Sequence, residues 1–232
     1  MQRILVTGSN RGIGLEFVRQ LSARGDQVFA AARNPENSAQ LMTLCHQYPD
    51  RVIPIVLDVA DQASVDAAFE GISAQTGVLD ILINNAGIYP SGERLGKLTR
   101  EQLRATFEVN TIGPLMIVQT LLPLLRAASD AKVINLSTGM ASIADVGYGG
   151  YYSYRGSKAA LNMISRVLSF ELRSMGISVL AINPGWVQTD MGGQGAPVRV
   201  EQSVRGMLRL IDGLSLAQSG SFVEYTGNSE SW

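Results

Sequence analysis

The sequence has very little of the residues from which most nucleophilic and metal sites are built. Its 232 residues include one cysteine, Cys45, and one histidine, His46. A single cysteine excludes an internal disulfide and a site with several cysteine ligands. A single histidine leaves neither a Ser-His-Asp triad nor a zinc site with several histidines. We therefore expect no metal site, and any proton transfer must use other side chains.

Excess charge and long apolar runs are also missing. The formal net charge is −1, so no strong field attracts a nucleic acid or an anionic membrane surface. The apolar runs fall short of a membrane span, and one begins at Ile4, which leaves no room for the charged segment of a signal peptide. We expect a cytoplasmic protein whose partners are small molecules rather than nucleic acid or membrane.

Short runs rich in β-forming residues alternate with helical patterns along the chain. This alternation, with unbroken apolar strands, predicts an α/β fold with helices on both faces of a parallel sheet. No linker or repeat divides residues 1–232, so we expect a single domain. The predicted strands are Arg3–Thr7, Val28–Ala32, Val52–Leu57, Ile81–Ile83, Val133–Leu136, Val179–Ile182 and Ser221–Tyr225. The predicted helices are 13–24, 36–47, 62–75, 99–125, 154–174 and 199–211.

The turn "TGSNRGIG" at residues 7–14 lies between the first predicted strand and the first helix. Its glycines allow a tight turn, close approach to a pyrophosphate and close packing of helix on strand, and the helix N-terminus supplies N–H donors. A turn that only connects is the simpler alternative. The residues predicted to bind a dinucleotide here are Gly8, Asn10, Arg11, Gly12, Ile13 and Gly14.

The end of the second strand indicates which dinucleotide is preferred. An acidic residue at this point would bind the adenosine ribose 2′-hydroxyl, but "FAAARNP" offers Ala32 and then Arg33. Together with Arg11, Arg33 would attract a 2′-phosphate, so the pattern favours NADP(H) over NAD(H). Both arginines would serve equally well as solvated surface charges if no cofactor binds.

Polar residues also end the third and fourth predicted strands. Asp58 follows Leu57, and "NNAG" occupies residues 84–87. Asp and Asn at such positions commonly form turns with their own backbone. Two adjacent asparagines followed by Ala-Gly provide more amide groups than a turn requires, which favours a binding role.

Taken in order, five motifs resemble the short-chain dehydrogenase/reductase family in its small single-domain form. They are TGxxxGxG at 7–14, NNAG at 84–87, Asn110 within "EVNTIGP", YxxxK at 154–158 and "NPGWVQTD" at 183–190. The segment "GGYYSYRGSKAALNM" most resembles the branch that contains carbonyl reductases and C-factor signalling proteins. The resemblance implies a Rossmann-type, doubly wound, seven-stranded parallel sheet in the order 3-2-1-4-5-6-7, and a homodimer or homotetramer paired through the helices at 99–125 and 154–174.

The resemblance also implies roles for individual residues. Tyr154 would exchange a proton with the substrate oxygen, Lys158 would bind the nicotinamide ribose and lower the tyrosine pKa, and Asn110 would position a water molecule. Asp58 would contact the adenine ring, Asn84 and Gly87 the ribose side of the cofactor, and the 184–189 segment the nicotinamide. The cofactor-binding residues implied in this way, beyond Asp58, are Val59, Asn84, Ala86, Gly87, Pro184, Gly185, Val187 and Thr189.

The position of the family's catalytic serine is occupied by Thr138 in "INLSTGMASI". A hydroxyl that donates to a carbonyl oxygen is all that the role requires, and threonine provides one. Ser137 and Ser142 remain competing candidates.

The stretch "YYSYRGSK" at 151–158 contains two tyrosine–cation pairs with helical spacing, Tyr151 with Arg155 and Tyr154 with Lys158. A nearby ammonium favours the phenolate, which suits Tyr154 for proton transfer during hydride chemistry on a carbonyl. The apolar pattern predicts that Ser153 caps the helix, so Tyr151 would precede it. Tyr151 and Tyr152 would then line the substrate entrance or be partly exposed loop residues.

The predicted activity is therefore NADP(H)-dependent reduction of a small or apolar aldehyde or ketone. Ile88, Tyr89, Tyr148, Trp186 and Met191 suggest a partly aromatic pocket. The C-factor resemblance leaves open a signalling or dinucleotide-sensing protein that acts through a partner. An epimerase or dehydratase is disfavoured, because such relatives carry a larger C-terminal substrate domain and few residues follow "NPGWVQTD" here.

Overall fold

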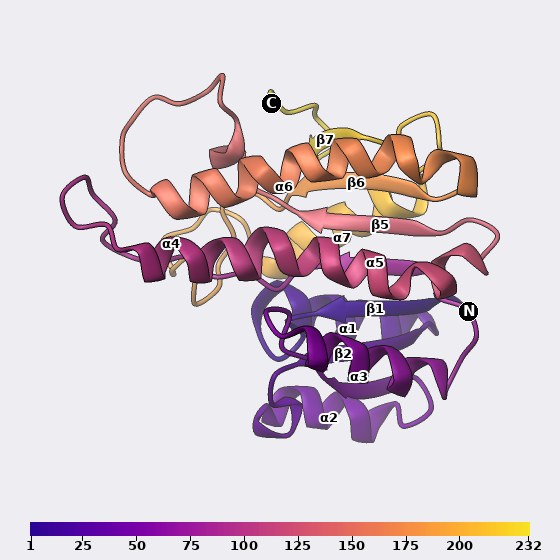
Figure 1. Ribbon diagram of the computed structural model, residues 1–232. Helices are drawn as coiled ribbons and strands as arrows, with labels where there is room; N and C mark the ends of the chain where they lie inside the picture. The colour runs from indigo at the N-terminus through magenta and orange to yellow at the C-terminus, as the bar shows by residue number, and fades with distance from the viewer.

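The computed structural model describes residues 1–232 and contains one parallel sheet of seven strands in the order β3-β2-β1-β4-β5-β6-β7. The predicted fold class and strand order are confirmed, and the observed strand ends lie within one residue of the predicted ones. The chain runs outward from β1 to one edge at β3 and then from β4 to the other edge at β7 (Figure 1). The strands are β1 (Arg3–Thr7), β2 (Gln27–Ala32), β3 (Val52–Val56), β4 (Ile81–Asn84), β5 (Lys132–Leu136), β6 (Ser178–Asn183) and β7 (Ser221–Glu224).

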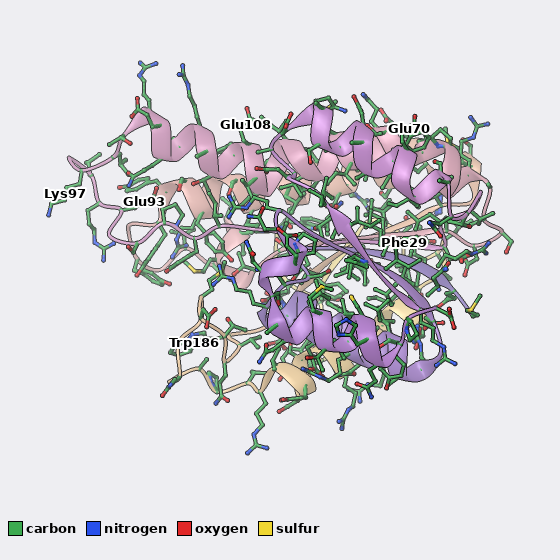
Figure 2. All side chains as sticks on the ribbon, turned by 90° about the horizontal axis from the view of Figure 1, so that it is seen from below. Phe29, Glu70, Glu93, Lys97, Glu108 and Trp186 are labelled. Carbon is green, nitrogen blue, oxygen red and sulfur yellow. The ribbon has the colours of Figure 1, made fainter.

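Helices cover both faces of the sheet (Figure 1). Successive residues of β1 point to opposite layers, so that Ile4 and Val6 pack with the helices of one face and Leu5 with those of the other. The first layer contains α1 (Gly12–Arg24), α2 (Ala39–Gln47) and α7 (Val200–Asp212). The second layer contains α3 (Gln62–Ser73), α5 (Gly113–Arg126) and α6 (Tyr152–Glu171), with α4 (Arg100–Phe107) leading into α5. Phe29 of β2 is fully buried between the layers (Figure 2).

The single helix predicted over 99–125 is divided by a π-helical turn at Glu108–Ile112. The Gly113 N–H donates to the carbonyl of Glu108, five residues earlier, which widens the turn by one residue. Apolar periodicity continues through this segment, so the pattern gave no sign of the interruption. The turn lies beside α6 and carries Asn110.

The combined stretch Arg100–Arg126 is long and apolar enough to cross a membrane by length and composition alone. Half of its most apolar window is buried in the protein, where Ile117 and Leu121 of α5 pack in the second core layer. The apolar character of this stretch is therefore that of a core helix. Its polar start, with Thr99 capping α4 through the Gln102 N–H, is exposed.

Candidate functional site

Two adjoining cavities lie at the end of the sheet where the strands have their carboxyl termini, as expected for this fold class. The first, of about 380 Å³, follows the glycine-rich turn and the ends of β2 to β5. The second, of about 700 Å³, lies between the segment after β5 and the loop after β6. Tyr154 belongs to the lining of both, so its ring marks the junction between them.

The glycine-rich turn is shaped to admit the backbone of a ligand. Gly8 has a φ of +68°, in the left-handed region that favours glycine. A Cβ atom at Gly14 would lie 2.2 Å from the Gly8 carbonyl oxygen, so only glycine allows α1 to begin this close to β1. Arg11, at the N-cap of α1, makes no side-chain capping bond, which leaves the first N–H groups of the helix free for an anion. These features fit a dinucleotide pyrophosphate.

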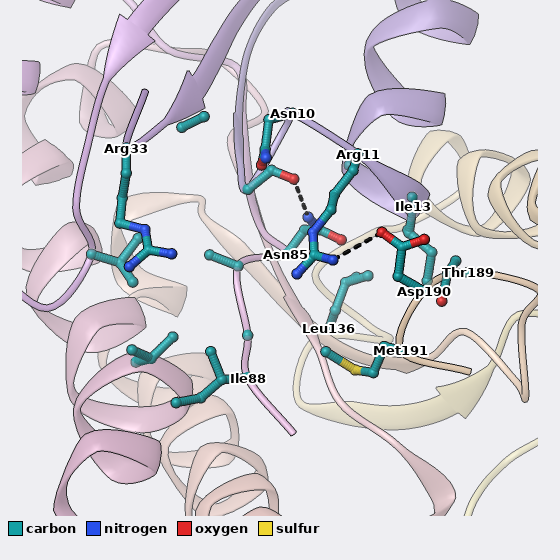
Figure 3. A pocket seen from close by; sticks show the side chains of 18 of the residues that line it. Asn10, Arg11, Ile13, Arg33, Asn85, Ile88, Leu136, Thr189, Asp190 and Met191 are labelled. Atoms are coloured by element: carbon teal, nitrogen blue, oxygen red, sulfur yellow. Dashed lines mark hydrogen bonds and ion pairs between the residues drawn. The ribbon is translucent and has the colours of Figure 1, made fainter. Parts of the chain in front are cut away.

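The far end of the first cavity carries basic and amide groups rather than carboxylates near β2. Arg33 lines it together with Asn34 and Asn37, two residues that the motif-based prediction did not include. In Figure 3, Arg33 stands on one side of the cavity and Arg11 on the other. Arg11 forms an ion pair at 2.9 Å with Asp190 of the loop after β6, and both side chains are exposed. Asp190 was also absent from the prediction.

Asn84 does not lie in the cavity, contrary to the prediction. Its side chain is buried and donates to the Asn135 Oδ1 at 2.8 Å. The next residue, Asn85, lines the cavity and holds the glycine-rich turn by donating to the Thr7 and Gly8 carbonyls. The reason is the alternation of a strand, in which adjacent side chains leave on opposite faces.

Most of the other predicted cofactor residues do line the first cavity, and two line its neighbour. Gly185 and Val187 face the second cavity, because the chain after β6 turns away from the glycine-rich loop at Gly185, where φ is +81°. The predicted residues that line the first cavity are Gly8, Asn10, Arg11, Gly12, Ile13, Gly14, Arg33, Asp58, Val59, Ala86, Gly87, Tyr154, Lys158, Pro184 and Thr189.

Tyr154 and Lys158 share one face of α6 and are both buried. The Lys158 ammonium donates to the Leu136 carbonyl at 2.6 Å. Burial lowers the pKa of Lys158 to about 8. Burial raises the pKa of Tyr154, partly offset by a hydrogen bond with Thr138. The expected lowering of the Tyr154 pKa by Lys158 is therefore wrong for the protein without cofactor, since desolvation of the phenolate dominates and the ammonium is held by a backbone carbonyl.

The three candidate hydroxyls after β5 point in different directions. The Ser137 Oγ donates to Asn162 at 2.6 Å inside the protein. The Ser142 Oγ donates to Asp145 at 2.7 Å. The Thr138 side chain lies in the second cavity within hydrogen-bonding reach of Tyr154. Thr138 is thus the hydroxyl that the fold brings beside the tyrosine.

Asn110 joins the loop after β4 to α6. Its Oδ1 accepts from the Ile88 N–H at 2.9 Å, and its Nδ2 donates to the Ile88 carbonyl at 3.0 Å and to the Ser157 Oγ at 3.1 Å. The side chain is fully buried, and the π-helical turn points it at these partners. Asn110 therefore holds the wall of the first cavity against the helix that carries Tyr154.

The start of α6 differs from the prediction. The helix begins at Tyr152, and its N-cap is Tyr151 rather than Ser153. Tyr151 has a φ of +57°, the only positive value at a residue other than glycine. Its carbonyl accepts from the Arg155 N–H, so the two residues are one turn apart after all. A left-handed tyrosine leaves no trace in the helical apolar pattern, which explains the error.

Aromatic side chains form one wall of the second cavity. Tyr89 stacks on Tyr151 with ring centroids 5.3 Å apart and packs edge-on against Tyr154 at 4.7 Å. Tyr148 and Trp186 also line this cavity, whereas Tyr152 lines neither cavity. Figure 2 shows Trp186 at the rim of this end of the molecule. The wall provides apolar surface directly beside the Tyr154 ring.

Comparisons with known proteins agree with this geometry. The family description "short chain dehydrogenase" matches residues 2–197. The chain is 45% identical to the C-signal protein of Myxococcus xanthus over 157 residues, which cover 68% of this chain and 95% of that protein. It superposes with a TM-score of 0.95 on the NADPH-bound carbonyl reductase from chicken fatty liver, at 38% identity, covering 100% of this chain and 99% of the other.

The carbonyl reductase Sniffer of D. melanogaster also superposes with a TM-score of 0.95, at 33% identity and full coverage of both chains. The family match, the strand order and the two cavities lead to one conclusion: this chain belongs to the short-chain dehydrogenase family of oxidoreductases.

Proposed function

We propose that the protein reduces the carbonyl group of a small or apolar aldehyde or ketone with NADPH. The observation that carries this proposal is the position of Tyr154, whose ring lies between the two cavities with Thr138 on one side and Lys158 one helical turn away. A proton donor at that junction meets a substrate in the second cavity and a cofactor in the first. The similarity to carbonyl reductases, one of them NADPH-bound, supports the same reaction.

The first cavity fits NADP(H) better than NAD(H). Arg33 is the basic side chain beside β2, Arg11 is a second one that is paired with Asp190, and no carboxylate lines the cavity at the end of β2 to bind a 2′-hydroxyl. An arginine about 4 Å from a phosphate gains on the order of 4 kcal/mol per unit charge at an effective dielectric of 20, reduced by salt at an open site. When bound, the nicotinamide cofactor supplies the hydride.

The side chains around the junction divide the remaining work. Tyr154 gives its proton to the substrate oxygen, and Thr138 donates a hydrogen bond that holds that oxygen. Lys158 binds the nicotinamide ribose. When the Lys158 ammonium turns toward Tyr154, its positive charge favours the phenolate that proton transfer leaves on the tyrosine. Asn110 holds the loop at Ile88 against α6 through hydrogen bonds to both segments.

The aromatic wall and the exposed face of α6 bear on the substrate and on the assembly of the protein. The aromatic wall of Tyr89, Tyr148 and Tyr151 suits an apolar substrate. We infer that the whole chain forms one catalytic domain in the cytoplasm. We also infer a homodimer or homotetramer paired through α4–α5 and α6, since Met163 and Phe170 of α6 are exposed.

A carbonyl panel tests the proposal. We expect purified protein to oxidise NADPH in the presence of at least one apolar aldehyde, ketone or quinone, with a lower KM for NADPH than for NADH. Tyr154→Phe should lower kcat by about 10²–10⁴-fold, the usual contribution of general acid catalysis. Tyr152→Phe is the matched control, because it removes the same hydroxyl from a tyrosine outside both cavities. Absence of turnover across the panel, or equal activity of the two variants, would contradict the proposal.

The 45% identity to the C-signal protein supports a second candidate function, signalling through a partner. The two candidate functions can be distinguished in cells that depend on the protein. A Tyr154→Phe variant that loses turnover yet keeps the biological effect would favour signalling. Loss of both would favour catalysis.

A further inference from the structure

Polar atoms without partners gather at the start of α6. Three of the seven buried side-chain polar atoms that lack a hydrogen-bond partner belong to this region: Oε1 of Glu93, Oγ of Ser153 and Nε of Arg155. Each such atom carries a desolvation cost that the native fold normally avoids. Their position directly around Tyr154 shows that the cost is concentrated at the proposed proton donor.

The backbone is strained at the same place. Tyr151 holds a left-handed conformation that is unfavourable for a side chain with a Cβ. The loop between β4 and α4 packs against it: the Arg94 guanidinium lies 5.4 Å from the Tyr151 ring centroid, and Tyr89 stacks on the ring. Gly150 favours this approach, since its φ is +97° and a Cβ there would lie 3.1 Å from the Glu93 carbonyl oxygen.

Glu93 of this loop supplies the cap that α6 lacks. No side chain of α6 itself caps its N-terminus, and its first turn contains no acidic residue. Ser153 is the second helical residue, whose N–H a capping side chain ordinarily satisfies. That N–H donates to the Glu93 Oε2 at 2.9 Å, across 60 residues of sequence, and Glu93 is only 2% exposed. A buried carboxylate therefore sits at the positive end of the helix.

We propose that Glu93 is a positioning residue for the reduction: its buried carboxylate fixes the first turn of α6 and thereby aims the Tyr154 hydroxyl at the substrate oxygen. The inference rests on the proposed function. Tyr154 is the next residue after the one that Glu93 holds, so a displacement of the Ser153 N–H is passed directly to it. The same loop places Tyr89 against the Tyr154 ring, so the loop contacts the start of α6 at two points.

The test compares Glu93 variants with a control of similar structural cost. Glu93→Ala removes the acceptor, Glu93→Asp retains the charge but is one methylene too short, and Glu93→Gln retains an oxygen at the right reach. Asp80→Ala is the control, because the Asp80 carboxylate binds the Arg3 backbone and side chain at the amino-terminal end of the two central strands, β1 and β4, opposite the end that carries the cavities. Turnover of one apolar aldehyde, KM for NADPH, Tm and hydrogen exchange of the 151–157 segment are measured for each.

We expect Glu93→Ala and Glu93→Asp to lower kcat about tenfold and to speed exchange of residues 151–157, with KM for NADPH changed less than twofold. Glu93→Gln should stay within about twofold of the wild-type kcat. Asp80→Ala should lower Tm without lowering kcat. Wild-type kcat in both Glu93→Ala and Glu93→Asp, or an equal loss of kcat in Asp80→Ala, would overturn the positioning role.

The exchange measurement separates this inference from the proposed function. Failure of the wild-type protein to reduce any carbonyl would count against the function alone. Unchanged exchange of the 151–157 segment in Glu93→Ala would overturn the hold of Glu93 on α6, whatever the turnover.

Discussion

Replacing Lys158 with methionine should stabilise the cofactor-free protein while abolishing turnover. Burial lowers the pKa of Lys158 from 10.5 to about 8, a difference that corresponds to about 3 kcal/mol against burying the ammonium. Methionine has nearly the same length and no charge. The Leu136 carbonyl loses its 2.6 Å donor, which costs about 1 kcal/mol. The net gain of about 2 kcal/mol should raise Tm by roughly 4–8 °C in a chain of this size.

The gain should depend on pH in one direction. The folded-state pKa of Lys158 lies below the unfolded value, so the wild-type protein bears the full penalty below about pH 8 and loses it as the pH rises to 10.5. The wild-type free energy of unfolding therefore increases between these values, and the advantage of Lys158→Met shrinks over the same window. Urea unfolding followed by circular dichroism at pH 7 and pH 10 measures both effects.

Lys132 provides the matched control. It is as deeply buried as Lys158, but its ammonium forms an ion pair with Asp130 at 3.4 Å and donates to two carbonyls, those of Ile211 and Asp212, at the end of α7. Lys132→Met should therefore destabilise the protein at both pH values. The reasoning would be refuted if Lys158→Met unfolded at or below the wild-type urea midpoint at pH 7, or if its advantage were undiminished at pH 10.

Three further predictions concern the two cavities and the surface. Thr138→Ala should lower kcat at least tenfold, since one hydrogen bond to a developing oxyanion is worth about 2.7–4 kcal/mol. Ser142→Ala should keep most of the turnover in the same steady-state assays. The reverse result would assign the role to Ser142. Asp190→Asn frees Arg11 from its ion pair and should lower the Kd for NADPH several-fold at low salt and less at high salt. The Kd is measured by quenching of protein fluorescence. An unchanged or higher Kd would show that Asp190 does not compete with the NADPH phosphate for Arg11. Phe170→Glu places a charge on the exposed face of α6 and should convert a dimer or tetramer to smaller species in light scattering, whereas an unchanged mass would place the interface elsewhere.

The order of strands and helices was predictable because each buried strand is an unbroken apolar run and each helix has an apolar stripe. The glycine-rich turn was equally clear, since the requirement for glycine at Gly8 and Gly14 is a local steric one. Periodicity alone could not distinguish Asn84 from Asn85, because the face on which a strand's last residue emerges depends on where the strand ends.

Other features depend on contacts between distant segments. Glu93 caps a helix 60 residues away, and Asp190 meets Arg11 across 179 residues, so neither pairing has a local signal. The raised pKa of Tyr154 is likewise a consequence of burial, which a YxxxK spacing does not reveal.

The π-helical turn at Glu108–Ile112 makes chain length at this point part of the site. One extra residue is accommodated between Phe107 and Gly113 without breaking the helical path. Deleting a single residue there would restore ordinary helical geometry, leave α4 and α5 nearly in phase, and remove the widened turn that points Asn110 at its partners. Asn110 would then face away from Ile88, and the cavity wall would lose its attachment to α6. The number of residues in the turn is therefore as important as the Asn110 amide group that the turn carries.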